Sequence, residues 1–164
     1  MKMKIIALIM LILVTCYPYS TEEAIIEQEH PIYLEEVVIV PLDYDSLVLV
    51  TLWNNGISIN LSYIILAQMK HESFNFTSNI FIEGNNCTGM KHPNKRRTLS
   101  LGSHRKHARY ASVEDCVLDY VYYLNARKLP NHEVSIKKYL KLLKNKGYFE
   151  DDYDTYYKGV KYFH

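Results

Sequence analysis

The sequence lacks an apolar run long enough for an ordinary membrane-spanning helix. Its longest run, Ile5 to Val14, has ten residues, whereas a helix needs about 20 apolar residues to cross a bilayer. Lys2 and Lys4 precede this run, and a basic start followed by a short apolar stretch is typical of a signal peptide. We therefore expect an exported protein that meets a membrane only through its N-terminal segment.

The N-terminal segment could be cleaved, carry a lipid or remain as a short anchor. Ordinary cleavage is expected between Cys16 and Ser20. Residues 13–16 also loosely resemble a bacterial lipobox with an atypical Thr15, so a lipid anchor on Cys16 and a short uncleaved anchor stay open as alternatives. No internal repeat or low-complexity linker divides the remainder. We expect a signal peptide or lipoprotein signal at 1–20, an acidic lead segment at 21–44 and one compact domain at 45–164.

Cysteine is scarce, with three in 164 residues, and their spacing fits no metal motif. The seven histidines form no paired-ligand pattern with them, so we expect no metal and no cofactor. With Cys16 removed or lipidated, Cys87 and Cys116 remain as an even pair in an oxidising compartment. A disulfide between these two and a pair of simple buried thiols both fit the sequence.

Charges of one sign are missing from two long stretches, although the net charge is only +1. Residues 21–60 contain eight acids and no Lys or Arg, whereas residues 84–113 contain seven Lys or Arg and no acid. Such asymmetry indicates either attachment within the fold or a basic strip for an anionic partner. Nucleic acid is not the expected partner, because export is predicted and no recognition motif is present.

An apolar stripe with helical spacing ends in a carboxylate; its members are Leu61, Ile65, Gln68 and Glu72. They share one helix face, and Asn60 is a suitable N-cap. At the helix C-terminus Glu72 meets the negative end of the macrodipole, and partial burial would disfavour its charged form further. A Glu kept protonated near neutral pH can protonate a departing sugar oxygen. The alternative is a solvated Glu on the last helical turn.

The segments around Glu72 resemble a known family. They read ILAQMKHES (65–73), FNFTSNIF (74–81), NNCTGMKHP (85–93), HARYAS (107–112) and VEDCVLDY (113–120). In this order they resemble the bacterial and phage glucosaminidase domains that cut peptidoglycan, of which the flagellar muramidases are members. The resemblance implies a lysozyme-like fold, peptidoglycan glycan strands as the partner, Glu72 as the general acid and Tyr110 as a catalytic residue that stabilises developing charge.

Further site residues follow from the same comparison and from position. Asn85, Asn86 and Gly89 match the turn after the catalytic helix, so the resemblance implies that they form this turn or contact the glycan. Arg97 belongs to the basic segment, where it could hold the carboxylates of peptidoglycan stems. Tyr148 follows a helix-ending glycine and is expected to line the cleft.

The chain departs from the family pattern at the second acid. Relatives commonly read NNLFG where this chain reads NNCTG, and many carry an acid in the β-hairpin that faces the catalytic Glu. The corresponding segment here has no acid. Glu83 is a candidate second acid, or equally a surface acid before a turn. The alternative is that the substrate's own 2-acetamido group attacks the anomeric carbon, with Glu72 as the acid.

The remaining chain predicts helices around a small β-lobe. Ser112 and Ser135 are suitable N-caps for two helices, and Asp152 or Asp154 for a last one. Residues 91–109, with strand-like alternation at 97–101, predict a β-hairpin. We therefore expect an α+β, mainly α, lysozyme-like helical domain with a small β-hairpin lobe over a substrate cleft.

Two expectations concern which side chains face the core. The resemblance favours a helix at 45–54 that packs Leu47, Val50 and Trp53 against the catalytic helix. In the last helix, the spacing of apolar residues predicts that Tyr157 is buried.

Together these observations predict a monomeric peptidoglycan hydrolase, an endo-β-N-acetylglucosaminidase that cleaves the β-1,4 bond after N-acetylglucosamine. One alternative is a lytic transglycosylase, which also uses a single Glu but leaves an anhydro sugar. The other is a wall-binding protein that keeps the fold without catalysis.

Overall fold

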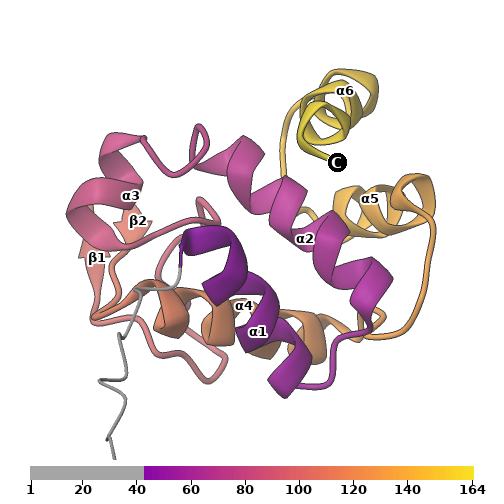
Figure 1. Ribbon diagram of the computed structural model, residues 1–164. Coiled ribbons are helices and arrows are strands. Elements are labelled where there is room, and N and C mark those ends of the chain that lie inside the picture. Colours follow the sequence, from indigo (N-terminus) through magenta and orange to yellow (C-terminus); the bar gives the residue numbers. More distant parts are fainter. Residues whose placement is uncertain (1–42) are drawn as a thin grey trace, which may run out of the picture. The chain divides into compact units, whose positions relative to one another are not determined.

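The computed structural model describes residues 43–164, which form six helices and one short β-hairpin (Figure 1). The elements are α1 (Tyr44–Asn54), α2 (Ile59–Glu72), α3 (Asn79–Gly84), β1 (Ser103–His104), β2 (His107–Ala108), α4 (Val113–Arg127), α5 (Ile136–Asn145) and α6 (Tyr153–Phe163). The expected α+β, mainly helical class with a small β-lobe is confirmed. The predicted signal segment, Cys16 and residues 21–42 of the acidic lead lie outside the described residues.

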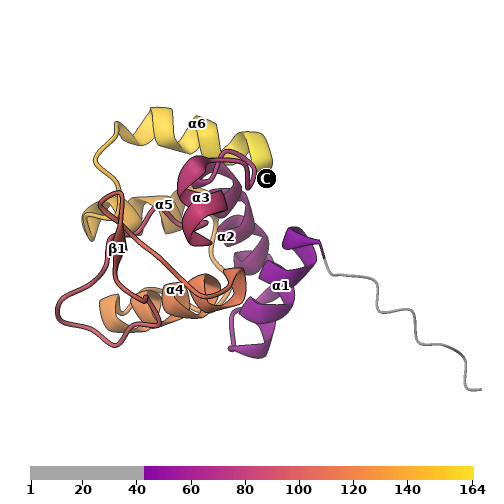
Figure 2. The same cartoon turned by 90° about the vertical axis from the view of Figure 1, so that its left-hand side faces the viewer.

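The central helix is α2, with α6 on one side and α1 and α4 on the other (Figure 1, Figure 2). The predicted stripe is confirmed, because Leu61, Ile65 and Gln68 are fully buried. The expected N-cap is wrong: Ser58, and not Asn60, has the extended backbone that precedes the first turn. The buried face of α2 ends at Glu72, its last residue.

The buried face of α1 differs from the predicted one. Val48 and Leu52 are fully buried, whereas Val50 and Trp53 are exposed, so the expectation that these two face the core is wrong. A helix has about 3.6 residues per turn, so a spacing of three drifts around it and a spacing of four follows one face better. Trp53 instead meets the ring of Tyr63 at the surface, with the ring centroids 6.4 Å apart.

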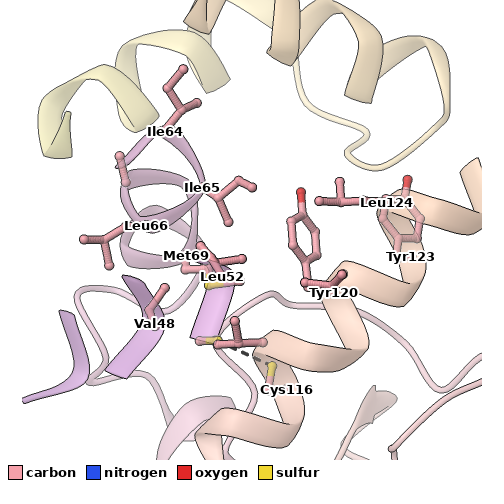
Figure 3. Close-up of a cluster of buried hydrophobic side chains, with 14 of the residues drawn as sticks. Val48, Leu52, Ile64, Ile65, Leu66, Met69, Cys116, Tyr120, Tyr123 and Leu124 are labelled. Carbon is pink, nitrogen blue, oxygen red and sulfur yellow. Dashed lines mark hydrogen bonds between the residues drawn. The ribbon is translucent and has the colours of Figure 1, made fainter. Parts of the chain in front are cut away.

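Tyrosines form part of the core between α4, α5 and α2. Tyr120 and Tyr139 are fully buried, and their hydroxyl oxygens lie 2.6 Å apart. The Tyr120 hydroxyl donates to Gln68 Oε1 at 3.0 Å. Figure 3 shows Tyr120 and Leu124 pointing from α4 toward α2. Because these hydroxyl groups are satisfied inside the core, Tyr120 and Tyr139 act as structural residues.

The predicted N-caps of α4, α5 and α6 are present as Ser112, Ser135 and Asp152. In α6 the buried tyrosine is Tyr156, so the expectation that Tyr157 is buried is wrong. Tyr156 lies four residues before the fully buried Val160, which places both on one helix face. Tyr157 is half-buried beside them.

The hairpin is shorter than the sequence predicted. Arg105 and Lys106 between its strands both have positive φ, of 49° and 68°, as a type I′ turn requires. The strand expected at 97–101 does not form in the described structure, where two backbone N–H groups of this segment donate to side chains. The Leu99 N–H, for example, donates to Asp119 Oδ1 at 3.0 Å.

Candidate active site

Glu72 lies in a cavity of ≈ 640 Å³ at the C-terminal end of α2. Three segments contribute most of its lining: the end of α2, residues of the 88–93 segment, and residues 147–151 between α5 and α6. Further lining residues are Arg96, Tyr123, Arg127 and Tyr156. The buried stripe of α2 thus reaches a cavity at its final residue, as the sequence predicted.

Both oxygens of the Glu72 carboxyl group have defined neighbours. The Tyr156 hydroxyl donates to Oε1 at 2.5 Å. Oε2 faces Gly89, where an added Cβ would lie 2.9 Å from it. Burial raises the pKa of Glu72 to about 7, although the hydrogen bond from Tyr156 lowers it and the negative charge of Asp151 raises it further. Glu72 can therefore hold a proton near neutral pH and donate it.

The turn after α3 is built by the two predicted asparagines. Asn85 has φ 50° and forms the C-cap of α3, and its amide group donates to the carbonyl of Tyr110. Asn86 is buried, and its amide group donates to the carbonyls of Met90 and Ala108 at 3.0 and 2.8 Å. Neither asparagine lines the cavity. Of the two roles that the resemblance implied for them, the geometry matches that of turn formation.

Gly89 is the residue of this turn that reaches the cavity. Its φ of +65° favours glycine, and its missing side chain leaves the space that Glu72 Oε2 occupies. The backbone conformation thus favours glycine at position 89, and a side chain there would displace the Glu72 carboxyl group.

Tyr148 lines the cavity, where the sequence predicted it. Its hydroxyl donates to the Thr88 carbonyl at 2.6 Å, which joins the α5–α6 loop to the turn that contains Gly89. Burial raises the pKa of Tyr148 well above its usual value, so this hydroxyl stays protonated and keeps donating.

Tyr110 lies away from the cavity, and the direct catalytic role expected for it needs correction. Its side chain is 2% exposed, and its hydroxyl donates to Asp119 Oδ2 at 2.9 Å. Tyr110 is absent from the residues that line the cavity with Glu72. The buried Tyr110 hydroxyl group is thus bonded within the fold, to Asp119.

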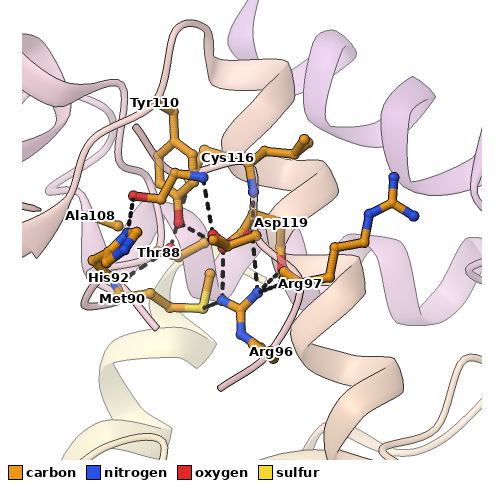
Figure 4. Close-up of polar contacts among 12 residues, drawn as sticks. Thr88, Met90, His92, Arg96, Arg97, Ala108, Tyr110, Cys116 and Asp119 are labelled. Atoms are coloured by element: carbon orange, nitrogen blue, oxygen red, sulfur yellow. Dashed lines mark hydrogen bonds and ion pairs between the residues drawn. The ribbon is translucent and has the colours of Figure 1, made fainter. Parts of the chain in front are cut away.

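Arg96, and not the predicted Arg97, lines the cavity. Its guanidinium group donates to both carboxylate oxygens of the fully buried Asp119, at 2.9 and 2.7 Å (Figure 4). Burial would raise the pKa of Asp119, but hydrogen bonds, first of all from Arg96, hold it below its usual value. Arg97 points elsewhere and lies over the Tyr122 ring, 4.5 Å from its centroid.

Glu83 does not line the cavity that contains Glu72. Its carboxylate binds His104 Nε2 at 2.8 Å and Arg105 Nε at 2.9 Å at the surface of the hairpin. The hairpin contacts the 86–90 turn through His107, whose Nδ1 lies 2.9 Å from the Gly89 carbonyl oxygen, but its strands do not line the cavity. Of the two alternatives that the sequence left open for Glu83, the geometry matches that of a surface acid.

Sequence reasoning missed two cavity residues that act on Glu72, Tyr156 and Asp151. Tyr156 could have been found from its i, i+4 spacing with Val160. Asp151 belongs to the run Glu150, Asp151 and Asp152, which carries no motif. No local signal connects this run with Glu72.

The two described cysteines lie side by side below the turn. Cys87 and Cys116 are fully buried free thiols whose sulfur atoms are 3.4 Å apart. The hydrogen bond between the two thiols, together with burial, raises the pKa of Cys87 well above its usual value. Within residues 43–164, no three His, Cys, Asp or Glu side chains gather as metal ligands would.

Comparisons with known proteins agree with this architecture. The family model for glucosaminidase, described as mannosyl-glycoprotein endo-beta-N-acetylglucosaminidase, matches residues 54–161. No curated protein matches the chain. The fold is similar to the structure of a type VI secretion system effector-immunity complex from Pseudomonas protegens, with a TM-score of 0.56 and 15% identity over 73% of this chain and 85% of that chain. The lysozyme-like architecture is thereby confirmed.

Proposed function

The chain belongs to the glucosaminidase family, and from this premise we propose that it hydrolyses peptidoglycan at the β-1,4 bond after N-acetylglucosamine, with Glu72 as the general acid. The observation that carries this proposal is the environment of Glu72. Its carboxyl group lies in a cavity and has its pKa raised to about 7. A glycosidic oxygen must receive a proton as its bond breaks, and a half-protonated Glu at neutral pH can supply it.

The shape and charge of the cavity support a glycan substrate. Lys91 and Arg127 line it with exposed side chains, so they can attract the free carboxylates of peptidoglycan stems. Arg105, by contrast, is paired with Glu83 at the hairpin. We therefore assign the attraction of the glycan to Lys91 and to Arg127 of α4, and not to the whole basic segment 84–113.

The experiment that tests the proposal is digestion of purified sacculi followed by mass spectrometry of the products. The wild-type chain should release fragments with N-acetylglucosamine at the reducing end. Glu72→Gln should lower the rate by about 10²–10⁴-fold, because it removes the proton donor. Gln has nearly the same shape, and its Oε1 can still accept the Tyr156 hydrogen bond. Glu133→Gln, in the exposed α4–α5 loop, is the matched control and should cleave at the wild-type rate.

The same products separate the alternatives. Anhydro sugar ends that depend on Glu72 would identify a lytic transglycosylase instead of a hydrolase. Binding to sacculi without any cleavage, unchanged by Glu72→Gln, would identify a non-catalytic wall-binding protein and overturn the proposal.

A substrate outside the cytoplasmic membrane requires export, so we place the protein in the periplasm, the cell envelope or outside the cell. The predicted signal segment at 1–20 supports this, with a lipid on Cys16 as one form of attachment. None of the helices within residues 43–164 has both the length and the apolar character needed to cross a membrane.

A further inference from the structure

The proposed hydrolysis needs a group that activates water or supports the anomeric carbon, and the acidic residues that line the cavity with Glu72 are Glu150 and Asp151. Resting on the proposed function, we propose that Asp151, between α5 and α6, is the second catalytic carboxylate. It would stand in place of the hairpin acid that this chain lacks.

The loop that carries Asp151 is fixed by an aromatic contact and by hydrogen bonds to its backbone. Phe149 is buried and stacks on the Tyr156 ring, with centroids 3.7 Å apart and planes inclined by 6°. Tyr156 is the residue that donates to Glu72. Lys144 Nζ donates to the Glu150 and Asp151 carbonyls, at 2.9 and 2.6 Å. The backbone at Asp151 is thus connected to Glu72 through two packed aromatic rings.

The three consecutive acids of this loop have different surroundings. The Asp152 carboxylate caps α6 by accepting the N–H of Thr155 at 3.1 Å. Glu150 and Asp151 both line the cavity with exposed side chains. The charge of Asp151 raises the pKa of Glu72 and opposes the lowering of the pKa of His71 by burial, whereas Glu150 contributes to neither shift. Asp151 is therefore the acid whose charge acts on Glu72.

The proposed hydrolysis consumes only the glycosidic bond and one water molecule. The oxygen of a water molecule forms a bond to the anomeric carbon while the bond from that carbon to the leaving oxygen breaks. Glu72 gives its proton to the leaving oxygen, and Asp151 accepts a proton from the attacking water. Exchange with solvent then returns both carboxyl groups to their starting states.

The test compares Asp151→Asn, Asp151→Ala and Glu150→Gln in the full chain, on purified sacculi. Asp151→Asn should lower kcat by about 10²–10⁴-fold while binding to sacculi persists. Glu150→Gln, its neighbour in the same loop, should stay within a few-fold of wild type. Azide should restore cleavage to Asp151→Ala and appear in the product as a glycosyl azide, because a small anion can occupy the vacated carboxylate position. A merely structural role would give no such product.

A second readout does not depend on turnover. NMR titration of Glu72 in Asp151→Asn should give a lower pKa than in the wild-type chain, because a like charge has been removed. The other titratable and charged groups that line this cavity are His71, Lys91, Arg96, Tyr123, Arg127, Tyr148, Glu150 and Tyr156. They are unchanged in the variant, so the shift reports Asp151.

The outcomes separate this inference from the proposed function. Wild-type cleavage that is lost in Glu72→Gln but kept in Asp151→Asn overturns the role of Asp151 alone and favours attack by the substrate's acetamido group. A wild-type chain that cleaves no glycan overturns both. An Asp151→Asn variant that fails to bind sacculi or to fold, together with an Asp151→Ala variant that azide does not rescue, also overturns the catalytic role.

Discussion

The two regions on either side of the cavity, residues 84–110 and 144–160, use their polar side chains differently. In the first region Asn86, Arg96 and Tyr110 bond to backbone carbonyls or to Asp119, and so hold the fold together. In the second region Tyr156 and Asp151 act on Glu72. The segments with recognisable motifs thus build the scaffold, whereas a segment without a motif shifts the pKa of the proposed acid.

The greatest loss of stability should come from breaking the ion pair between Arg96 and Asp119, which tests the role of the first region in the fold. Arg96→Met should lower the free energy of unfolding by about 3–5 kcal/mol, because it leaves the buried Asp119 carboxylate without a counter-ion. Urea denaturation measures this loss. Arg97→Met is the matched control: Arg97 is exposed and loses only its contact with Tyr122, so the change should be below about 1 kcal/mol. Equal losses from both variants would contradict the assignment.

Each of the two regions contains a tyrosine that donates to a carboxylate, Tyr110 to Asp119 and Tyr156 to Glu72. Replacing them should have different effects, both smaller than that of Arg96→Met. Tyr156→Phe should raise the pKa of Glu72, because the hydrogen bond that favours the charged form is removed. Activity that requires protonated Glu72 should then persist to higher pH. A pH–rate profile on sacculi measures this shift.

Tyr110→Phe is the control for that prediction. It removes a hydrogen bond to Asp119 and should lower the free energy of unfolding by about 1.5–3 kcal/mol. Its pH–rate profile should match that of wild type, because Tyr110 does not line the cavity. If Tyr110→Phe moved the profile and Tyr156→Phe did not, the contrast between the two regions would be reversed.

The smallest effect is expected at Glu83. Glu83→Gln removes ion pairs with His104 and Arg105 at the surface of the hairpin, well outside the cavity lining. Lysis of sacculi should be unchanged. A loss of lytic activity comparable to that of Glu72→Gln would identify Glu83 as the second acid.

Local periodicity explains what could be predicted from the sequence. The Leu61, Ile65 and Gln68 stripe and the Ser112 cap depend on neighbours within a few turns, and both are present. The raised pKa of Glu72 also followed from its place at the end of a buried face.

What could not be predicted depends on contacts between distant segments. Tyr156 meets Glu72 across 84 residues of sequence, and no local pattern encodes that pairing. Arg96 and Arg97 lie in an irregular segment, where no period indicates which of two neighbouring side chains faces inward. This is why Arg97 was predicted where Arg96 lines the cavity.

The placement of Glu72 also affects the folded chain as a whole. Its pKa is about 7 in the folded protein against an ordinary value of 4.5, so folding takes up a proton between these two pH values. The contribution of this residue to the free energy of unfolding is therefore greatest in mild acid and declines as the solution approaches neutrality. Acidification, which destabilises many proteins, here removes the cost of burying the charged form of Glu72.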